Sequence, residues 1–235
     1  MLNLKLGKLT FLVAACLLGN VASATSLKTP GIRGSDHDFS KFLMLNTKGT
    51  ALDEICIFCH APHRNGLPDI GNNNNDGPLW NHNLSTATYT PYTSATMKAV
   101  PGQPNGVSKL CLSCHDGTVA IDSYGRNTPA GHMISDVQFG TGSKVIGTDL
   151  TNDHPISFAF DAALVAADGE LNDPATTTIL PGLNSITGTI AGELLDSSGQ
   201  VQCTSCHDPH NGPGINKLLK VNNTGSALCL TCHNK

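Results

Sequence analysis

The chain is 235 residues long, carries a formal net charge of −4, and has only 5% aromatic residues beside 24 glycines and 13 prolines. The acidic balance, without a basic stripe, argues against nucleic acid as a partner. A chain so poor in large apolar side chains buries little area by itself and would be marginally stable. The composition therefore predicts that something other than side chains completes the interior.

The first 24 residues have the organisation of a secretory signal peptide. Lys5 and Lys8 give a positive start, residues 9–19 are largely apolar, and residues 22–24 (Ala-Ser-Ala) form a small-residue cleavage site. The apolar run is too short to span a membrane. Cys16 offers lipid attachment as the alternative, but the chain stays apolar after it. We expect cleavage after residue 24 and an exported product, periplasmic or extracellular, whose charge becomes −4 − 2 = −6.

One five-residue pattern, Cys-x-x-Cys-His, occurs four times and uses eight of the nine cysteines. It is typical of c-type haem attachment, in which two thioethers hold the macrocycle and the adjacent histidine binds the iron. Zinc sites, disulfide frameworks and thioredoxin-like dithiols do not require a histidine directly after every pair. The sequence therefore predicts four covalently attached haems as cofactors. The attaching cysteines are Cys56 and Cys59 (motif 1), Cys111 and Cys114 (motif 2), Cys203 and Cys206 (motif 3), and Cys229 and Cys232 (motif 4).

Histidines are numerous enough to ligate every iron on both sides. The expected proximal ligands are the motif histidines His60, His115, His207 and His233. The first candidates for the distal positions are His37, His63, His154 and His210, and the next are His82 and His132. Methionine ligation, which would raise the reduction potential, is the alternative offered by Met44, Met97 and Met133. Because histidines exceed the distal positions, we expect bis-histidine ligation at all four irons and low potentials.

Two distal candidates follow their own motif too closely to serve it. His63 lies three residues after His60, and His210 lies three residues after His207. Three residues span roughly 10 Å when fully extended, too little to pass around the edge of a macrocycle. If His63 and His210 are ligands, each must bind the haem of another motif. The alternative for both is a solvent-facing histidine.

The other candidates differ in how firmly the local sequence presents them. His154 lies between Asp153 and Pro155, where turn chemistry and proline fix the backbone. His37 is flanked by two aspartates, either of which can orient its ring. Further candidates are His82, which lies beside Trp80, and His132. Each of His37, His82 and His132 can instead be a surface or packing histidine.

The predicted fold is mostly irregular, with short helices and a small β-hairpin wrapped around haems that act as the core. Residues 25–235 form one tetrahaem domain in this interpretation. β-Branched residues predict strands at 176–180, 186–190 and 200–203, with a turn at 196–199. The alanine-rich residues 161–167 predict a helical turn instead. Without haem, we expect the chain not to fold.

Several blocks outside the cysteine pairs resemble a known family. They are His37-Asp-Phe-Ser, Ala61-Pro-His63, Pro78-Leu-Trp-Asn-His82, Asp116-Gly-Thr118, Gly147-Thr-Asp-Leu-Thr-Asn-Asp-His-Pro-Ile156 and Asp208-Pro-His210. From about residue 35 to the end, the chain is similar to the doubled CxxCH multihaem cytochromes of metal-respiring bacteria, and within these to exported tetrahaem cytochromes of the OmcE type, which polymerise into extracellular filaments. The resemblance implies bis-histidine ligation, a continuous chain of haems, and in some cases a distal histidine donated across a subunit contact. Six candidates in one chain mean that such donation is not required here.

Electron transfer without bond chemistry is the function that these patterns favour. The expected partners are other redox proteins or extracellular electron acceptors, and further copies of the chain in a homopolymer. The alternative is a multihaem reductase of nitrite, sulfite or a similar oxyanion, which needs one iron with an open distal position. No motif lacks its histidine, so the sequence marks no such iron.

Overall fold

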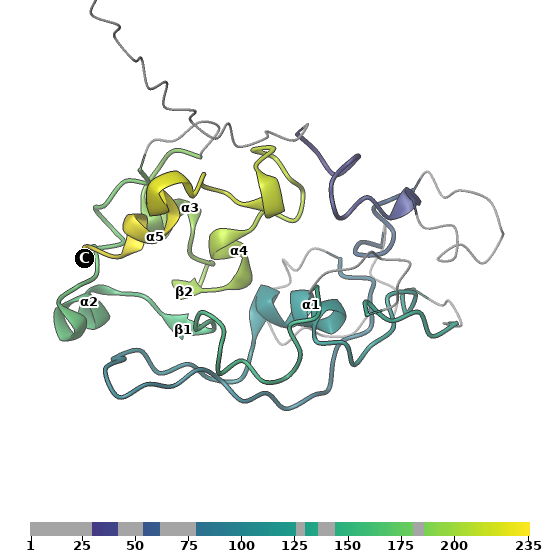
Figure 1. Cartoon of the computed structure of the whole chain (residues 1–235), viewed down its shortest axis with the longest axis horizontal. Helices are drawn as coiled ribbons and strands as arrows, with labels where there is room; N and C mark the ends of the chain where they lie inside the picture. The colour runs from purple at the N-terminus through teal and green to yellow at the C-terminus, as the bar shows by residue number, and fades with distance from the viewer. Residues whose placement is uncertain (1–29, 42–53, 62–78, 126–129, 136–143, 181–185) are drawn as a thin grey trace, which may run out of the picture.

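The computed structural model describes residues 30–41, 54–61, 79–125, 130–135, 144–180 and 186–235 (Figure 1). Its helices are short: α1 (Gly106–His115), α2 (Ala162–Asp168), α3 (Ile190–Glu193), α4 (Cys203–Cys206) and α5 (Ala227–Cys232). Single turns of 3-10 helix lie at Phe39–Lys41, Asn216–Leu218 and Thr224–Ser226. Loops and turns make up most of the rest, so the predicted fold class, mostly irregular with short helices, is confirmed.

The motif helices lie between two ends of the molecule. α2, α3 and α5 gather at one end with the C-terminus, and residues 30–41 lie at the other end (Figure 1). α1 and α4 pack against each other between these ends. This arrangement brings motif 2, at the end of α1, beside motif 3, which forms α4.

The sheet is small and antiparallel, as predicted, but its strands are not all the predicted ones. β1 (Phe158–Ala159) pairs with β2 (Gln200–Val201), and Phe158 lies opposite Val201. β2 falls in a predicted strand, whereas β1 lies outside the predicted hairpin. The other two predicted strands meet only at an isolated antiparallel bridge between Thr178 and Thr189. The chain ends that second strand by starting α3, where the Thr189 side chain accepts a hydrogen bond from Gly192 N–H.

Two local predictions are confirmed by the backbone. The turn at 196–199 closes with Gly199 N–H donating to Asp196 O at 2.9 Å. α2 occupies the predicted helical turn and begins where the Asp161 carboxylate accepts the Leu164 N–H at 2.9 Å. It ends at Gly169, whose φ of 78° is left-handed and suits glycine.

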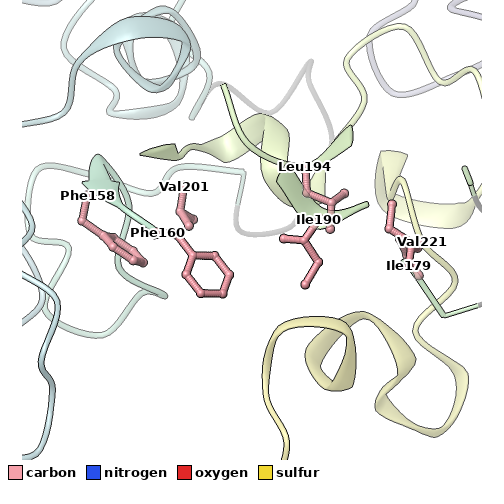
Figure 2. Packing of buried hydrophobic residues seen from close by; sticks show 7 residues of the cluster. All are labelled: Phe158, Phe160, Ile179, Ile190, Leu194, Val201 and Val221. Atoms are coloured by element: carbon pink, nitrogen blue, oxygen red, sulfur yellow. The ribbon is translucent and has the colours of Figure 1, made fainter. Parts of the chain in front are cut away.

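Three small apolar clusters form the side-chain interior of the described residues. Figure 2 shows the first, which joins both strands, α3 and the segment before α5. Its buried members are Phe158, Phe160, Ile179, Ile190, Leu194, Val201 and Val221. The second is built on Phe58, between the cysteines of motif 1, and the third includes Leu112, between those of motif 2. The first cluster is bordered by Cys232, and the second by Cys59 and Cys114. The apolar interior therefore reaches the cysteines of the motifs.

Several predictions fall on residues outside the described ranges. These include the signal peptide over residues 1–24, the lipid alternative at Cys16, and the ligand candidates Met44 and His63. Within the described ranges, no helix is long and apolar enough to cross a membrane. The assignment of residues 25–235 to one haem-bearing domain stays a prediction.

Candidate haem sites

Each Cys-x-x-Cys-His motif forms a single helical turn. The backbone N–H of the motif histidine donates to the carbonyl of the first cysteine, at 2.8 Å for His60, 3.0 Å for His207 and 2.9 Å for His233. In motif 2 the same five residues complete α1. Residues three apart on a helix share a face, so this turn directs both cysteines of a motif to one side. The eight cysteines are free thiols, and each stands where a thioether sulfur would be in the haem-bearing protein.

Three motif histidines leave their turn by the same backbone pairing. His60 forms an antiparallel bridge with Trp80, His207 with Leu219, and His233 with Leu171. In each bridge, the residue before the histidine accepts a hydrogen bond from the partner segment and the residue after it donates one. The histidine is thereby fixed between two hydrogen bonds to a distant part of the chain.

The fourth motif histidine is held by a different segment. The carbonyl of His115 accepts a hydrogen bond from Ile146 N–H at 2.7 Å. Its ring Nδ1 donates to the Lys144 carbonyl at 2.8 Å. Residues 144–147 therefore hold His115 from both backbone and side chain.

Three motif histidines face a distal candidate at nearly the same distance. The ring centroids of His60 and His210 are 6.0 Å apart. The corresponding distances are 6.2 Å for His115 with His37 and 6.4 Å for His233 with His154. Each pair thus joins one predicted proximal ligand to one of the first distal candidates. His210 lies opposite the histidine of motif 1, not the histidine of its own motif 3.

This spacing suits a metal ion held between two imidazoles. Metal–nitrogen bonds of about 2 Å on each side, with the ring centres set back from the bonding atoms, place two axial rings roughly 6 Å apart. Rings packed directly against each other also lie about 4.5–7 Å apart, so the weight of the observation comes from the motif histidine that is present in every pair. Interplanar angles of 15°, 43° and 72° show that the distance is shared although the ring orientations are not. The residues present therefore fit an iron porphyrin at these three places.

Backbone carbonyls fix the orientation of three of these rings and of the His207 ring in motif 3. The Nδ1 of His37 donates to Pro209 O at 3.2 Å, and that of His154 to Pro155 O at 2.9 Å. The Nδ1 of His207 donates to Lys217 O at 3.0 Å, as His115 does to Lys144. With Nδ1 used as a donor, Nε2 is the nitrogen that remains for iron.

The electrostatic surroundings favour neutral imidazole, the form that binds metal. Burial lowers the pKa of His37 and of His115. The neighbouring His115 lowers the pKa of His37 further, and His207 lowers the pKa of His115 further. Burial and the neighbouring His154 lower the pKa of His233 in the same direction. Protonation would therefore cost more at these rings than in water.

An unpartnered donor lies beside the first motif. Among the described residues, the Trp80 indole Nε1–H is buried with no hydrogen-bond partner. Trp80 forms the backbone bridge to His60, so this residue lies next to motif 1, and its ring packs edge-on against His82. An acidic substituent of a bound macrocycle is the kind of group that would satisfy this donor.

The remaining candidates are placed differently. His82 is buried, with Nδ1 2.8 Å from Asn83 O and Nε2 2.9 Å from Ala120 O, so both ring nitrogens face backbone carbonyls. His132 is half-buried, and its backbone N–H donates to Asp122. His207, the histidine of motif 3, is exposed. Of the four first distal candidates, three already face another motif histidine, and the fourth, His63, lies outside the described residues. The distal ligand of motif 3 stays a prediction, as does the assignment of iron ligands at the other three motifs.

A buried carboxylate directly follows the histidine of motif 2. Asp116 accepts hydrogen bonds from the Tyr89 hydroxyl at 2.6 Å and from Thr118 N–H at 2.8 Å. The Ser85 hydroxyl donates to the same carboxylate at 2.5 Å. Burial raises the pKa of Asp116, but hydrogen bonds from Ser85 and Tyr89 outweigh it and hold the pKa below its ordinary value. Asp116 is thus a fixed negative charge beside His115.

Sequence reasoning missed the groups that hold the ligands. Backbone carbonyls of Pro209, Lys144 and Lys217 leave no residue-type signal, because any residue has a carbonyl. The position of Pro155 directly after His154 was visible, but its role as acceptor was not. The polar residues Gln202 and Ser108, buried between motifs 2 and 3, gave no sign of their burial either.

Comparison with known proteins gives one family match. Residues 197–235 match the model described as "Doubled CXXCH motif", a range that contains motifs 3 and 4. No curated protein matches the chain. The family match supports c-type haem attachment and a multihaem c-type cytochrome-like chain.

Proposed function

We propose that this chain carries electrons along four bis-histidine c-type haems, one attached at each motif. When bound, the haem irons cycle between the ferrous and ferric states and so supply the redox chemistry. The observation that carries the proposal is the set of ring pairs at 6.0, 6.2 and 6.4 Å, each joining a motif histidine to a second histidine.

In this proposal the residues of the chain hold the haems and orient the imidazoles that bind them. Each cysteine pair would anchor one macrocycle, and the histidine that directly follows the pair would bind the iron of that macrocycle. Carbonyl acceptors hold the imidazoles as the Nδ1–H tautomer, which strengthens the nitrogen that faces the metal. The histidine pairs that would hold iron are His60 with His210, His115 with His37, and His233 with His154, and we propose His63 as the partner of His207.

Contacts between motifs support a continuous route. Cys59 of motif 1 and Cys114 of motif 2 pack against the same Phe58 cluster. Cys111 of motif 2 interacts directly with Cys203 of motif 3. Motif 4 continues the series. Burial raises the pKa of the Cys206 and Cys232 thiols, and a thiol of the other motif raises each further: Cys229 acts on Cys206, and Cys206 acts on Cys232. Each motif thus has at least one cysteine close to a cysteine of the next motif along the chain.

The test is the haem content and spin state of the purified holoprotein. The mass of the secreted protein should exceed that of the polypeptide by four macrocycles, and all oxidised irons should give low-spin paramagnetic resonance signals. A bare polypeptide would refute the proposal. A high-spin, five-coordinate iron would instead favour the oxyanion reductase, whose reaction needs an open distal position.

We also propose that the chain is exported and passes electrons to external acceptors, as a filament of many copies. The signal-peptide pattern over residues 1–24 and the family resemblance support this proposal. Electron micrographs of the native holoprotein distinguish a filament with a subunit repeat from a dispersed carrier. Small, monodisperse particles under every condition would count against polymerisation.

A further inference from the structure

A buried polar cluster joins the helical turns of motifs 2 and 3. α1 and α4 pack together (Figure 1). Gln202, the residue before α4, is only 1% exposed, and Ser108 of α1 is fully buried. Amides and hydroxyls are buried at a cost unless their hydrogen bonds are satisfied, so their presence in this contact requires partners.

Those partners come from both sides of the helix contact. The Ser108 hydroxyl donates to Gln202 Oε1 and accepts the backbone N–H of Cys203 at 3.0 Å. Gln202 Nε2 donates to Asn105 Oδ1 at 2.8 Å and to Asp196 Oδ2 at 3.0 Å. One hydroxyl of α1 thus binds the first residue of α4, and one amide before α4 binds back to the start of α1.

The same two residues lie directly beside the attachment positions. Ser108 precedes Cys111 by three residues on α1, so the two share a helix face. Gln202 directly precedes Cys203. The Cys111 and Cys203 side chains are in hydrogen-bond contact, and these thiols stand for one thioether sulfur of each motif. Any shift of α4 along α1 would therefore change the distance and direction between the Cys111 and Cys203 sulfurs.

Directional bonds fix this approach more tightly than apolar packing would. Apolar contacts are non-directional, whereas a buried amide that loses its partners pays the full desolvation penalty. Gln202 also donates its backbone N–H to Ser205 Oγ at 2.9 Å and accepts Ser205 N–H at 2.8 Å. The cluster therefore fixes the start of α4 internally as well as against α1.

We propose that Ser108 and Gln202 are positioning residues that fix the mutual orientation of the macrocycles at motifs 2 and 3 and so the electronic coupling between them. The inference rests on the proposed haem attachment at Cys111 and Cys203. It assigns to a polar helix contact the role of setting one step of the electron route, without either residue touching iron.

The experiment measures Soret circular dichroism of the oxidised holoprotein, because closely spaced haems give a two-signed signal whose amplitude depends on their mutual orientation. Ser108→Ala removes one hydroxyl without adding volume. We expect the amplitude to fall while the haem content and the low-spin absorption spectrum stay unchanged. Ser123→Ala is the matched control: Ser123 is also buried and accepts a hydrogen bond from Asn83 at 2.6 Å, but it lies outside the α1–α4 contact. Its amplitude should equal that of the wild type.

A second variant keeps the test decisive if Ser108→Ala loads haem poorly. Ser108→Ala combined with Gln202→Met removes both partners of their shared hydrogen bond, an exchange that costs less than leaving one partner unpaired. A reduced Soret amplitude in this fully loaded variant supports the proposal. Wild-type amplitude in it, or an equal loss in Ser123→Ala, overturns the proposal. Absence of haem from the wild-type protein would instead refute the proposed function, so the two failures are distinguishable.

Discussion

At the scale of single residues, the proposed iron sites depend on how an imidazole is held. A motif histidine has its position fixed by a helical turn on one side and by a backbone bridge on the other, as at His60 with Trp80. The facing histidine comes from elsewhere in the chain and has no such turn. His210 shows this difference, because it is exposed and its ring lies 3.7 Å from Asp208. Loss of a distal ligand should therefore leave the attachment itself intact.

The crossed pair gives the first prediction. His210→Ala should turn one haem high-spin, the one attached at motif 1, because His210 faces His60. His154→Ala should turn a different haem high-spin, and the double variant should show two. Electron paramagnetic resonance of the oxidised holoproteins counts these irons. If His210→Ala leaves every iron low-spin, the pairing with His60 is wrong.

The buried carboxylate gives the second prediction. Asp116→Asn removes a fixed negative charge next to His115, and that charge stabilises the ferric state of the nearest iron. The potential of that haem should rise on the order of tens of millivolts, the scale of one partly screened charge. Spectroelectrochemical titration measures the change. Glu193→Gln, an isosteric change at an exposed residue of α3, is the comparison; equal shifts in both variants would contradict a local effect.

At the scale of elements, caps and turn residues define the helices more than apolar periodicity does. α2 has no buried residue, yet it has an aspartate cap and a glycine in left-handed conformation at its end. α3 is capped by Thr189. The motif turns are short because the histidine must leave the helix in extended conformation to meet its bridge partner, as His207 and His233 do.

The cap of α2 gives the third prediction. Asp161→Ala removes the acceptor of Leu164 N–H and should cost about 1 kcal/mol of helix stability. Because α2 is exposed, hydrogen exchange of its amides is the suitable measurement, and we expect faster exchange in α2 alone. Asp161→Asn retains a capping oxygen and should exchange at nearly the wild-type rate. Equal acceleration in both variants would rule out the cap as the cause.

At the scale of the whole molecule, side chains supply only part of an interior. The apolar clusters are small and border attachment cysteines, with Cys232 beside the first and Cys59 and Cys114 beside the second. Haem in those positions would join clusters that the chain leaves separate. The folding of this molecule is therefore expected to depend on its cofactors.

Removal of one attachment gives the fourth prediction. Cys206→Ala, with one thioether of motif 3 lost, should reduce haem loading and destabilise the fold, since motif 3 lies between motifs 2 and 4. Haem-to-protein ratio and protease resistance measure the two effects. Thr204→Ser changes the same motif but keeps both sulfurs, and it should behave like the wild type. A folded Cys206→Ala protein with one haem fewer would contradict the dependence of the fold on haem.

The sequence by itself predicted the attachment chemistry, because Cys-x-x-Cys-His is complete within one helical turn and needs no distant residue. It also predicted the irregular fold class, the turn at 196–199 and the helix at α2, all of which depend on neighbouring residues. Only the tertiary structure decided that β2 pairs with β1, that His210 faces His60, and that the carbonyls of Pro209 and Lys144 hold the rings of His37 and His115. These relations join segments far apart in the chain, and residue type carries no information about which distant segment will lie opposite.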